Sequence, residues 1–526
     1  MATDAVVRSS AWADDRRVLT IGLIGLVTAV AFEGLAVPTV LPAMVADLGQ
    51  LELYGWAFSA FWLTNIVGIA VGGGDADRHG PGRAFALGVA LFAVGLLIAG
   101  IATSMPMVIA GRAVQGLGAG AIGAVVWVVI ARAYETDAMA RMIAMLSSAW
   151  VVPGLVGPAL AGVVTDQLSW RWVFLGLVPA VVVMGAVVAA PIRALGRPVD
   201  VADAPSPRGR RVVHALQLAA GSGLLLGALS VGQVFIAVSL GLVGGWLTLD
   251  ALRRLLPPGA LLARRGRPAV VAVMFLLSFA FFGTEAFVPL AVTTVRGEST
   301  TVGGLALSAA AVTWATGSWL PARIAQRGWR RELVASGSAF IGLGIVVAAL
   351  VLLPATPIPV AAIGWAIAGL GMGLAYSTLS LLILETAPPG GEGASSAALQ
   401  LAFTLGTAFG AGSGGALVAL SAVSDLSLAL GIALVNASML IAAVLAVALA
   451  WRVPGGVPGR AGDGEAEPAP DRGPARQPHP EPLIASPAGA ACAASFRLRC
   501  SPSSSGSPGG RCARALTSSP GPRLAR

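Results

Sequence analysis

The chain contains no lysine, so all 34 of its basic side chains are arginines. Charged residues make up 11% of the sequence, whereas they make up about a quarter of a soluble globular protein. Cysteine occurs three times, at Cys492, Cys500 and Cys512, with spacings that match no disulfide framework or metal site. The three histidines are scattered, and no nucleophile–base arrangement or phosphate-binding loop stands in a plausible context. We therefore expect no metal, no cofactor and no enzymatic activity.

Hydrophobic residues make up 56% of the chain, and they gather in runs long enough to cross a membrane. A bilayer core of about 30 Å needs roughly 20 mostly apolar residues in a helix. Fourteen such stretches are present, at residues 18–42, 54–74, 84–104, 106–131, 141–165, 171–192, 212–232, 234–252, 269–292, 301–322, 333–354, 358–384, 395–420 and 428–451. The expected fold class is an all-α polytopic membrane protein with fourteen transmembrane helices.

The loop arginines are divided unevenly between the two sides that these stretches define. Most of them fall on the side of the N-terminus, and Arg171 and Arg296 fall on the other side. By the positive-inside rule we expect both termini in the cytoplasm and the protein in the cell membrane. The net charge of +9 then reports topology, and it gives no reason to expect a nucleic-acid partner. The expected partners are membrane lipid, protons and a small-molecule substrate.

A repeat divides the chain into two halves. The run Gly111-Arg112 to Gly120 in the fourth stretch recurs as Gly364-Trp365 to Gly373 in the twelfth, at a separation of 364 − 111 = 253 residues. We expect two pseudo-symmetric six-helix bundles at residues 18–192 and 269–452, with the substrate path between them. A linker at 193–268 inserts a helical hairpin, residues 1–17 form a cytoplasmic segment, and a disordered cytoplasmic tail runs from 453 to 526.

The loop after the second stretch carries the first motif. Its candidate gate residues are Gly73, Asp77, Arg78, Gly80 and Arg83. They resemble the loop motif of the major facilitator superfamily, where this loop is linked to locking one half against the other. Asp77 would lie against the positive N-terminal end of the thirteenth span, near Ser395, when the cytoplasmic side is closed. The alternative is a solvated loop that turns at Gly80.

The fifth stretch has prolines and glycines where a membrane helix ordinarily has leucine and valine, at Pro153, Gly154, Gly157, Pro158 and Gly162. Glycine lets a neighbouring backbone approach and proline bends a helix, which predicts a tight, kinked helix contact. The pattern resembles the antiporter motif of the same superfamily. Residues 170–174 resemble the start of helix six in its fourteen-helix drug:proton antiporters. The resemblance implies export coupled to protons.

Three ionisable residues are expected at membrane depth: Glu33, Arg112 and Glu285. Each costs at least about 2.5 kcal/mol there, so each needs a partner or a function. A rise of about 1.5 Å per residue places Glu33 and Arg112 at nearly the same depth, where they could pair. Burial raises the proton affinity of a carboxyl group and a nearby arginine lowers it. Our hypothesis is that Glu33, tuned by Arg112, carries the proton, while Glu285 shares that role or contacts a cationic substrate.

The alternative is a purely structural role, in which Glu33 and Arg112 form a pair that only fixes helix packing and Glu285 faces an aqueous vestibule. Other polar and aromatic residues could line a cavity or could equally serve helix packing. These are Asn65, Gln115, Gln400, Asn436, Trp127, Trp150, Trp314 and Trp365.

The favoured function is a monomeric proton-coupled antiporter that exports lipophilic or cationic small molecules by alternating access, as in multidrug or antibiotic efflux. One alternative is a dedicated exporter of one endogenous metabolite or lipid-linked product. Another is a membrane sensor or scaffold that transports nothing, which would not need the intramembrane charges.

Overall fold

The computed structural model describes residues 14–196, 208–324, 329–389 and 391–455, and these residues form helices without any β-strand. Helices suit this composition because each satisfies its own backbone hydrogen bonds in a lipid environment. The helices up to residue 255 are α2 (Asp14–Leu48), α3 (Tyr54–His79), α4 (Pro81–Gly100), α5 (Met105–Ala133), α6 (Thr136–Gln167), α7 (Arg171–Leu175), α8 (Leu177–Ala194), α9 (Arg208–Ala228) and α10 (Val234–Leu255). The later ones are α11 (Arg267–Glu285), α12 (Val288–Leu290), α13 (Thr300–Ile324), α14 (Arg330–Ala349), α15 (Pro359–Glu385), α16 (Glu392–Val423) and α17 (Leu428–Ala450).

Short 3-10 and π segments connect some of these helices. The 3-10 segments are η1 (Leu51–Leu53), η2 (Ala260–Leu262) and η5 (Leu350–Leu352), and η3 (Ala291–Val295) is a π-helix. The predicted tail lies almost entirely outside the described residues, as do residues 1–13 of the predicted N-terminal segment. The helix of the first stretch is longer than predicted, because it begins at Asp14 and ends at Leu48.

Within the described residues, twelve helices are long and apolar enough to cross a membrane, judged by length and composition. Helices also lie at the other two expected spans, since α13 covers 301–322 and α9 covers 212–228 of the expected 212–232. These are α9, which starts in an arginine-rich run, and α13, which is rich in threonine, glycine and serine. The chain is therefore a multi-pass membrane protein, and the two remaining spans stay predictions.

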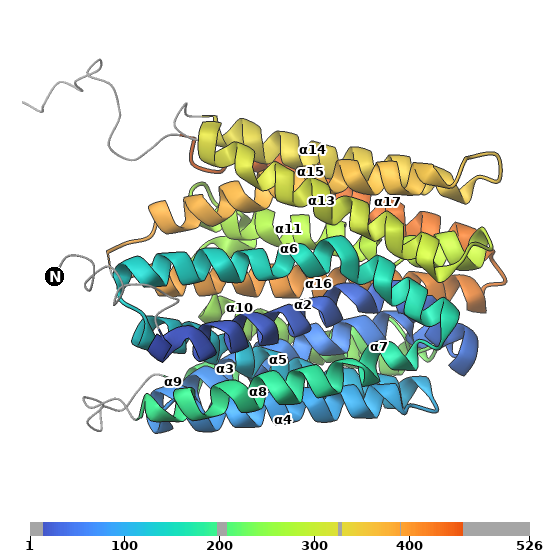
Figure 1. Ribbon diagram of the computed structural model, residues 1–526. Helices are drawn as coiled ribbons and strands as arrows, with labels where there is room; N and C mark the ends of the chain where they lie inside the picture. The colour runs from blue at the N-terminus through green and yellow to red at the C-terminus, as the bar shows by residue number, and fades with distance from the viewer. Residues whose placement is uncertain (1–13, 197–207, 325–328, 390, 456–526) are drawn as a thin grey trace, which may run out of the picture. The chain divides into compact units, whose positions relative to one another are not determined.

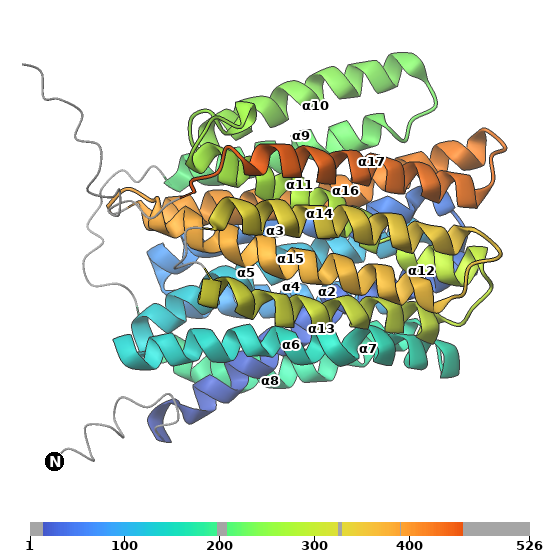
Figure 2. The ribbon, with the colours of Figure 1, turned by 90° about the horizontal axis from the view of Figure 1, so that it is seen from above.

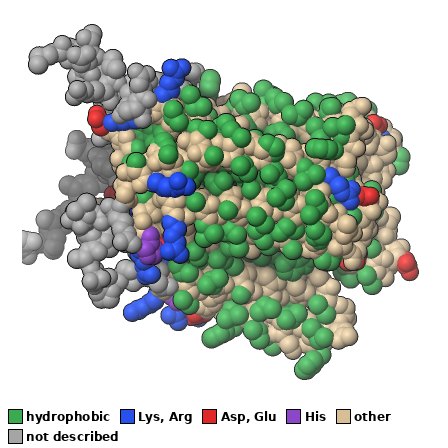
Figure 3. Space-filling view, turned by 60° about the horizontal axis from the view of Figure 1, so that its bottom comes forward, with side chains coloured by type: hydrophobic (Ala, Val, Ile, Leu, Met, Phe, Trp, Pro, Cys, Tyr) green, Lys and Arg blue, Asp and Glu red, His purple; other side chains and the backbone are tan. Residues whose placement is uncertain are grey.

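Arginines gather mainly at one end of the helix bundle, which we call the basic end. The helices run roughly parallel to one another (Figure 1), and those that start or finish at this end carry Arg16, Arg78, Arg132, Arg193, Arg254 and Arg330. Arg171 and Arg296 lie at the opposite end. Figure 3 shows hydrophobic side chains over the middle of one face and charged side chains toward its ends. The expected division of arginines is confirmed, and its assignment to the cytoplasm stays a prediction.

Helices α5 and α15 pack closely against two neighbours each, and glycine makes this possible. Gly116 of α5 faces the Phe61 carbonyl of α3, and Gly369 of α15 faces the Ala310 carbonyl of α13. The glycines are 369 − 116 = 253 residues apart and their partners 310 − 61 = 249 residues apart. The same two offsets relate the neighbours of Gly111 and Gly364, of Gly118 and Gly371, and of Gly120 and Gly373. The sequence repeat is thus matched by repeated helix contacts.

The pair α9 and α10 lies at the margin of the bundle (Figure 2). The two helices meet at small residues, because Gly221 of α9 faces Thr248 of α10 and Gly244 faces the backbone of α9 in return. Helix α10 exposes large apolar side chains, with Phe235 at 85% and Leu242 at 71%. In a membrane this face would contact lipid.

Candidate functional site

A buried polar cluster joins Glu33 of α2 to Arg112 and Gln115 of α5. Arg112 Nη1 donates a hydrogen bond to Glu33 Oε1, and each of these charged side chains is 1% exposed. Gln115 Nε2 donates to the same carboxylate oxygen at 3.3 Å, and Gln115 Oε1 accepts from Arg112 Nη1 at 3.2 Å. The predicted pairing of Glu33 with Arg112 is confirmed. Gln115 joins it because it lies one helical turn after Arg112.

Arg112 is also held by α3, the neighbour that the glycines of α5 bring close. Its Nε donates to the Ala57 carbonyl at 3.2 Å, and its guanidinium carbon lies 4.3 Å from the centre of the Phe61 ring. Glu33 Oε2 has no hydrogen-bond partner among the described residues. Asn65 of α3, also predicted for this site, is half-buried and is not a partner of these side chains. The cluster therefore presents one free carboxylate oxygen beside a fixed guanidinium.

Glu285 ends α11 and is 6% exposed, yet its carboxylate has no hydrogen-bond or ion-pair partner among the described residues. The sequence repeat explains why Glu285 lacks the partners that Glu33 has. The residue equivalent to Arg112 is Trp365, since 112 + 253 = 365, and the residue equivalent to Gln115 is Ala368, since 115 + 253 = 368. Trp365 instead stacks on Phe281, one turn before Glu285, with ring centres 4.9 Å apart. The two acids have similar positions in the sequence repeat, but one is paired and the other is unpaired.

Most of the motif residues of α6 lie against α13, whereas Gly157 faces Phe32 of α2. Both Pro153 and Pro158 are inside α6, which continues through them. A β-carbon on Gly162 would lie 2.6 Å from Thr301 Cα, and Gly304 of α13 faces the Pro158 carbonyl in return. The prediction of a tight helix contact is confirmed, and its partner is the helix of the tenth stretch.

One turn after Gly162, Asp166 caps the start of α13. Its Oδ1 accepts from the Thr300 backbone N–H at 3.1 Å, and its Oδ2 accepts from the Thr301 N–H at 2.9 Å and from Thr301 Oγ1 at 2.6 Å. A carboxylate at a helix N-terminus is stabilised by the unpaired N–H groups and by the helix dipole. Sequence reasoning missed Asp166, although an acid four residues beyond the last motif glycine was visible.

Further contacts join α3 to the second half of the chain, toward the end of the bundle that lies opposite the basic end. Tyr54 Oη donates to the Ala286 carbonyl at 2.7 Å, and Ser59 Oγ donates to the Ala408 carbonyl at 2.7 Å. A β-carbon on Gly55 would lie 2.8 Å from Gly415 Cα. Together with Asp166, these contacts hold α3 and α6 against α11, α13 and α16 at this end.

We expect Asp166→Asn to favour opening at this end by roughly tenfold. Loss of the charge weakens the cap by about 1–2 kcal/mol, and about 1.4 kcal/mol is tenfold in an equilibrium. The measurement is the distance distribution between spin labels on Leu168→Cys and Glu298→Cys, which should gain a longer component. Asp425→Asn, an exposed acid at the same end, is the control. Identical distributions for Asp166→Asn and the unsubstituted pair would show that the cap does not hold this end closed.

A cavity of about 220 Å³ lies between α5, α15 and α16, toward the basic end. Its lining residues are Trp127, Tyr376, Ser380, Ile383, Leu384, Ser396, Leu399, Gln400 and Phe403. None of these side chains is charged. Tyr376 and Phe403 extend an aromatic cluster, since their ring centres are 5.6 Å apart and Tyr376 lies 5.8 Å from Trp314. Stacking and neutral hydrogen bonding are the interactions that this cavity offers.

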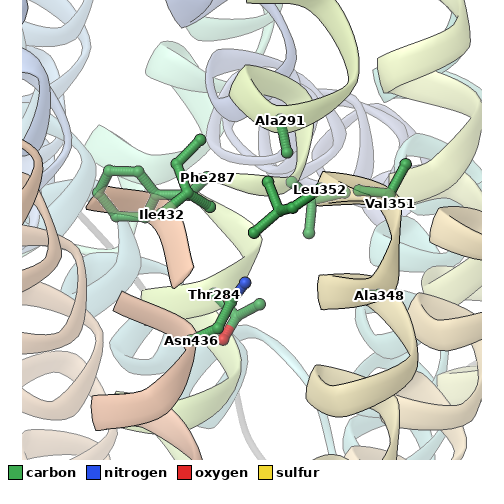
Figure 4. A pocket seen from close by; sticks show the side chains of 9 residues that line it. Thr284, Phe287, Ala291, Ala348, Val351, Leu352, Ile432 and Asn436 are labelled. Atoms are coloured by element: carbon green, nitrogen blue, oxygen red, sulfur yellow. The ribbon is translucent and has the colours of Figure 1, made fainter. Parts of the chain in front are cut away.

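Some of the polar and aromatic residues predicted to line a cavity lie at this one, and others do not. Trp127 and Gln400 line it, and Trp314 contacts its aromatic wall. Trp365 is fully buried in helix packing, and Trp150 is 45% exposed and does not line the cavity. Asn436 and Thr284 line a different pocket, which Figure 4 shows. Tyr376 and Phe403 were missed because an aromatic residue in a long apolar run carries no distinguishing signal.

The predicted gate loop turns at Gly80, whose φ of 85° favours glycine. Asp75 contacts two basic side chains of this loop. Its Oδ1 lies 2.8 Å from His79 Nδ1, and its Oδ2 lies 3.8 Å from Arg83 Nε. Gly73 makes a looser contact, because a β-carbon there would lie 3.8 Å from Ala124. The proposed position of Asp77 near Ser395 stays a prediction.

Comparison with known proteins gives the family. The chain matches the Major Facilitator Superfamily over residues 21–411, which is most of its length. It belongs to this superfamily. An uncharacterised MFS-type transporter of Mycobacterium tuberculosis is 29% identical over 466 residues, covering 83% of this chain and 64% of that protein. The multidrug transporter protein MdtP of Bacillus subtilis is 24% identical over 407 residues, covering 75% and 74%.

This superfamily member spans less than two thirds of the length of the first of these relatives. Among solved structures, a D-xylose–proton symporter resembles it with a TM-score of 0.57 and 14% sequence identity, covering 83% of this chain and 98% of that one. At this identity the likeness shows the transporter fold alone. The superfamily membership confirms the resemblance that the motifs of the loop after the second stretch and of the fifth stretch suggested.

Proposed function

We propose that this protein is a proton-coupled antiporter that exports lipophilic or cationic small molecules by alternating access. The observation that carries the proposal is the buried pair of Glu33 and Arg112, in a chain whose superfamily relatives include a named multidrug transporter. An ion pair at membrane depth is costly, so its presence points to a function. The function we propose is the gain and loss of a proton by Glu33 beside the fixed guanidinium of Arg112.

In the proposed cycle, Glu33 accepts a proton on its free Oε2. The proton removes the charge that holds Arg112, so α2 and α5 lose their ionic contact and repack. That change is coupled to release of the Asp166 cap, which opens the end opposite the basic end and discharges the substrate. In the structure the ion pair and the cap are both formed, as expected of the state that takes up substrate from the basic end.

The proposed architecture follows the repeated glycine contacts. Two six-helix halves, residues 18–192 and 269–452, enclose the path, and the 193–268 linker contributes α9 and α10 as an inserted hairpin. With α9 and α13 counted as spans, the chain joins the fourteen-helix group, works as a monomer in the cell membrane and has both termini in the cytoplasm. The gate loop then lies on the cytoplasmic face, where Asp77 and Arg78 lock the halves when that side is closed.

The uncharged aromatic cavity is the proposed entry point for substrate. We expect Trp127→Ala to weaken export of planar aromatic compounds by about 2–10-fold, because an aromatic contact contributes about 0.5–1.5 kcal/mol. The measurement is a drug-susceptibility panel in an efflux-deficient host. Trp150→Ala removes a comparably exposed tryptophan that does not line the cavity and should leave resistance unchanged. If wild-type protein confers no resistance and moves no compound in liposomes, the transport proposal fails.

A further inference from the structure

A short turn joins α10 to α11 at the basic end, and hydrogen bonds fix its position. It comprises residues 256–266, with the 3-10 segment η2 inside it, between two helices that are long and apolar enough to cross a membrane. The Gly266 N–H donates to the Arg452 carbonyl at 3.0 Å, and Arg452 Nη1 donates to the Ala263 carbonyl at 3.3 Å. Because the turn joins two spans, it lies at the membrane surface, and the residues after α17 hold it there.

This turn buries its small residues and exposes its large ones. Ala260 and Ala263 are buried, whereas Leu261 and Leu262 between them are 46% and 68% exposed. Water is an unfavourable environment for leucine side chains, and a turn held by hydrogen bonds cannot rearrange to bury them. Helix α10, which leads into the turn, also exposes large apolar side chains. Lipid is the surrounding that suits both the helix and the turn.

Arginines accompany these leucines without matching acids. Arg264 and Arg265 follow η2 directly, Arg253 lies in the last turn of α10, and all three are exposed. Asp250, the only acidic residue between positions 208 and 284, is paired with Arg254 at 3.1 Å. Among the described residues, Arg253, Arg264 and Arg265 form no ion pair. The turn therefore carries positive charge that the protein itself does not neutralise.

Helix α9 adds arginines to the same end of the hairpin, which lies at the margin of the bundle (Figure 2). Gly221 of α9 faces Thr248 of α10, and Gln217 Nε2 of α9 donates to Asp250 at 2.9 Å, so the two helices are antiparallel. The exposed arginines at positions 210–211, near the start of α9, therefore lie by the end of α10. Positive charge from three segments of the chain is concentrated here.

This combination of side chains selects the ligand. Guanidinium groups bind phosphate oxygens through paired, charge-assisted hydrogen bonds. The exposed leucines beside them call for an apolar part on the same ligand. An anionic phospholipid has both, because its phosphate and net negative charge suit the arginines and its acyl chains suit the leucines. Phosphatidylcholine carries the same phosphate, but its headgroup also carries a positive charge that cancels the attraction.

We propose that the turn between α10 and α11 binds an anionic phospholipid of the membrane leaflet at the basic end. Arg253, Arg264 and Arg265 contact the headgroup, and Leu261 and Leu262 contact the acyl chains. A ligand that binds the folded protein stabilises it, so this lipid should raise the unfolding temperature. The site goes beyond the proposed antiport function and does not depend on it.

The test uses the purified full chain in a neutral detergent. It is titrated with phosphatidylglycerol, with phosphatidylcholine of the same acyl chains, or with inorganic phosphate. The site variant combines Arg253→Gln, Arg264→Gln and Arg265→Gln. The control variant removes three other exposed arginines from the same end of the bundle, by Arg132→Gln, Arg141→Gln and Arg193→Gln. Thermal unfolding gives the apparent affinity, and native mass spectrometry counts the lipids that stay bound.

Phosphatidylglycerol should raise the unfolding temperature of wild type and of the control variant, while phosphatidylcholine and phosphate should not. The site variant should need about tenfold more phosphatidylglycerol for the same rise, because arginines near the surface attract anionic lipid. A variant with lysine at the same three positions keeps the charge and should retain most of the binding, which separates the site from a folding defect. A second variant, Leu261→Ser with Leu262→Ser, should also bind the lipid more weakly.

Three results would overturn the proposal. The first is a site variant that binds phosphatidylglycerol as wild type does. The second is an equal loss in the control variant, which would mean that the whole basic end attracts lipid without a defined site. The third is equal stabilisation by phosphatidylcholine or by inorganic phosphate, because an anionic lipid would then not be the preferred ligand. Each result can be obtained whether or not the protein moves any substrate.

Discussion

Replacing Arg112 with methionine is expected to destabilise the protein by about 3–5 kcal/mol, because Glu33 is left buried without its counter-ion. Arg112 is 1% exposed and also bonds to Gln115 and to the Ala57 carbonyl, so no water reaches the vacated position easily. The measurement is the free energy of unfolding in detergent. The double variant Glu33→Gln with Arg112→Met should recover most of the loss, since it removes both charges.

Arg330 provides a matched comparison for this result. It is 3% exposed and forms two hydrogen bonds with Glu385, whose side chain is 28% exposed. Arg330→Met should cost less, because water can hydrate the carboxylate that remains. Equal stability of wild type and Arg112→Met would contradict the view that the Glu33–Arg112 pair is dry and mutually dependent.

Replacing Glu285 with glutamine is expected to reduce substrate-driven proton movement, because Glu285 shares the proton-carrying role with Glu33, while the free energy of unfolding stays unchanged or rises. Glu285 has no ion pair to lose among the described residues, and glutamine removes a charge from membrane depth. The measurement pairs unfolding in detergent with a pH-sensitive dye enclosed in proteoliposomes. Glu298→Gln, an exposed acid outside the helices, is the control. Normal proton movement by Glu285→Gln would assign coupling to Glu33 alone.

The sequence was sufficient to predict the helices and the Glu33–Arg112 pair, because both follow from apolar run length and from the rise of an α-helix. The constant offset of 253 also predicted which glycines would be equivalent. The same offset pairs Arg112 with Trp365, so the sequence also indicated that Glu285 has no arginine equivalent to Arg112. In the structure Trp365 stacks on Phe281 instead of pairing with an acid.

Other features depend on contacts that no local pattern encodes. Asp166 caps α13 across more than 130 residues, so its role depends on how α6 meets α13. Thr284 and Asn436 are unremarkable in sequence, and they share one pocket because α17 approaches the C-terminal end of α11. The uncharged wall of the aromatic cavity likewise combines α5 with α15 and α16. Each of these sites needs the relative placement of distant helices.

The central claim is that substrate and protons move in opposite directions through the agency of Glu33. The direct measurement uses purified protein in liposomes that enclose a pH-sensitive dye, with a substrate found by the susceptibility panel. The account predicts that a substrate gradient drives protons the opposite way in wild type, and that Glu33→Gln abolishes this movement. Substrate flux in wild type without any proton movement, or unchanged coupling in Glu33→Gln, would contradict it.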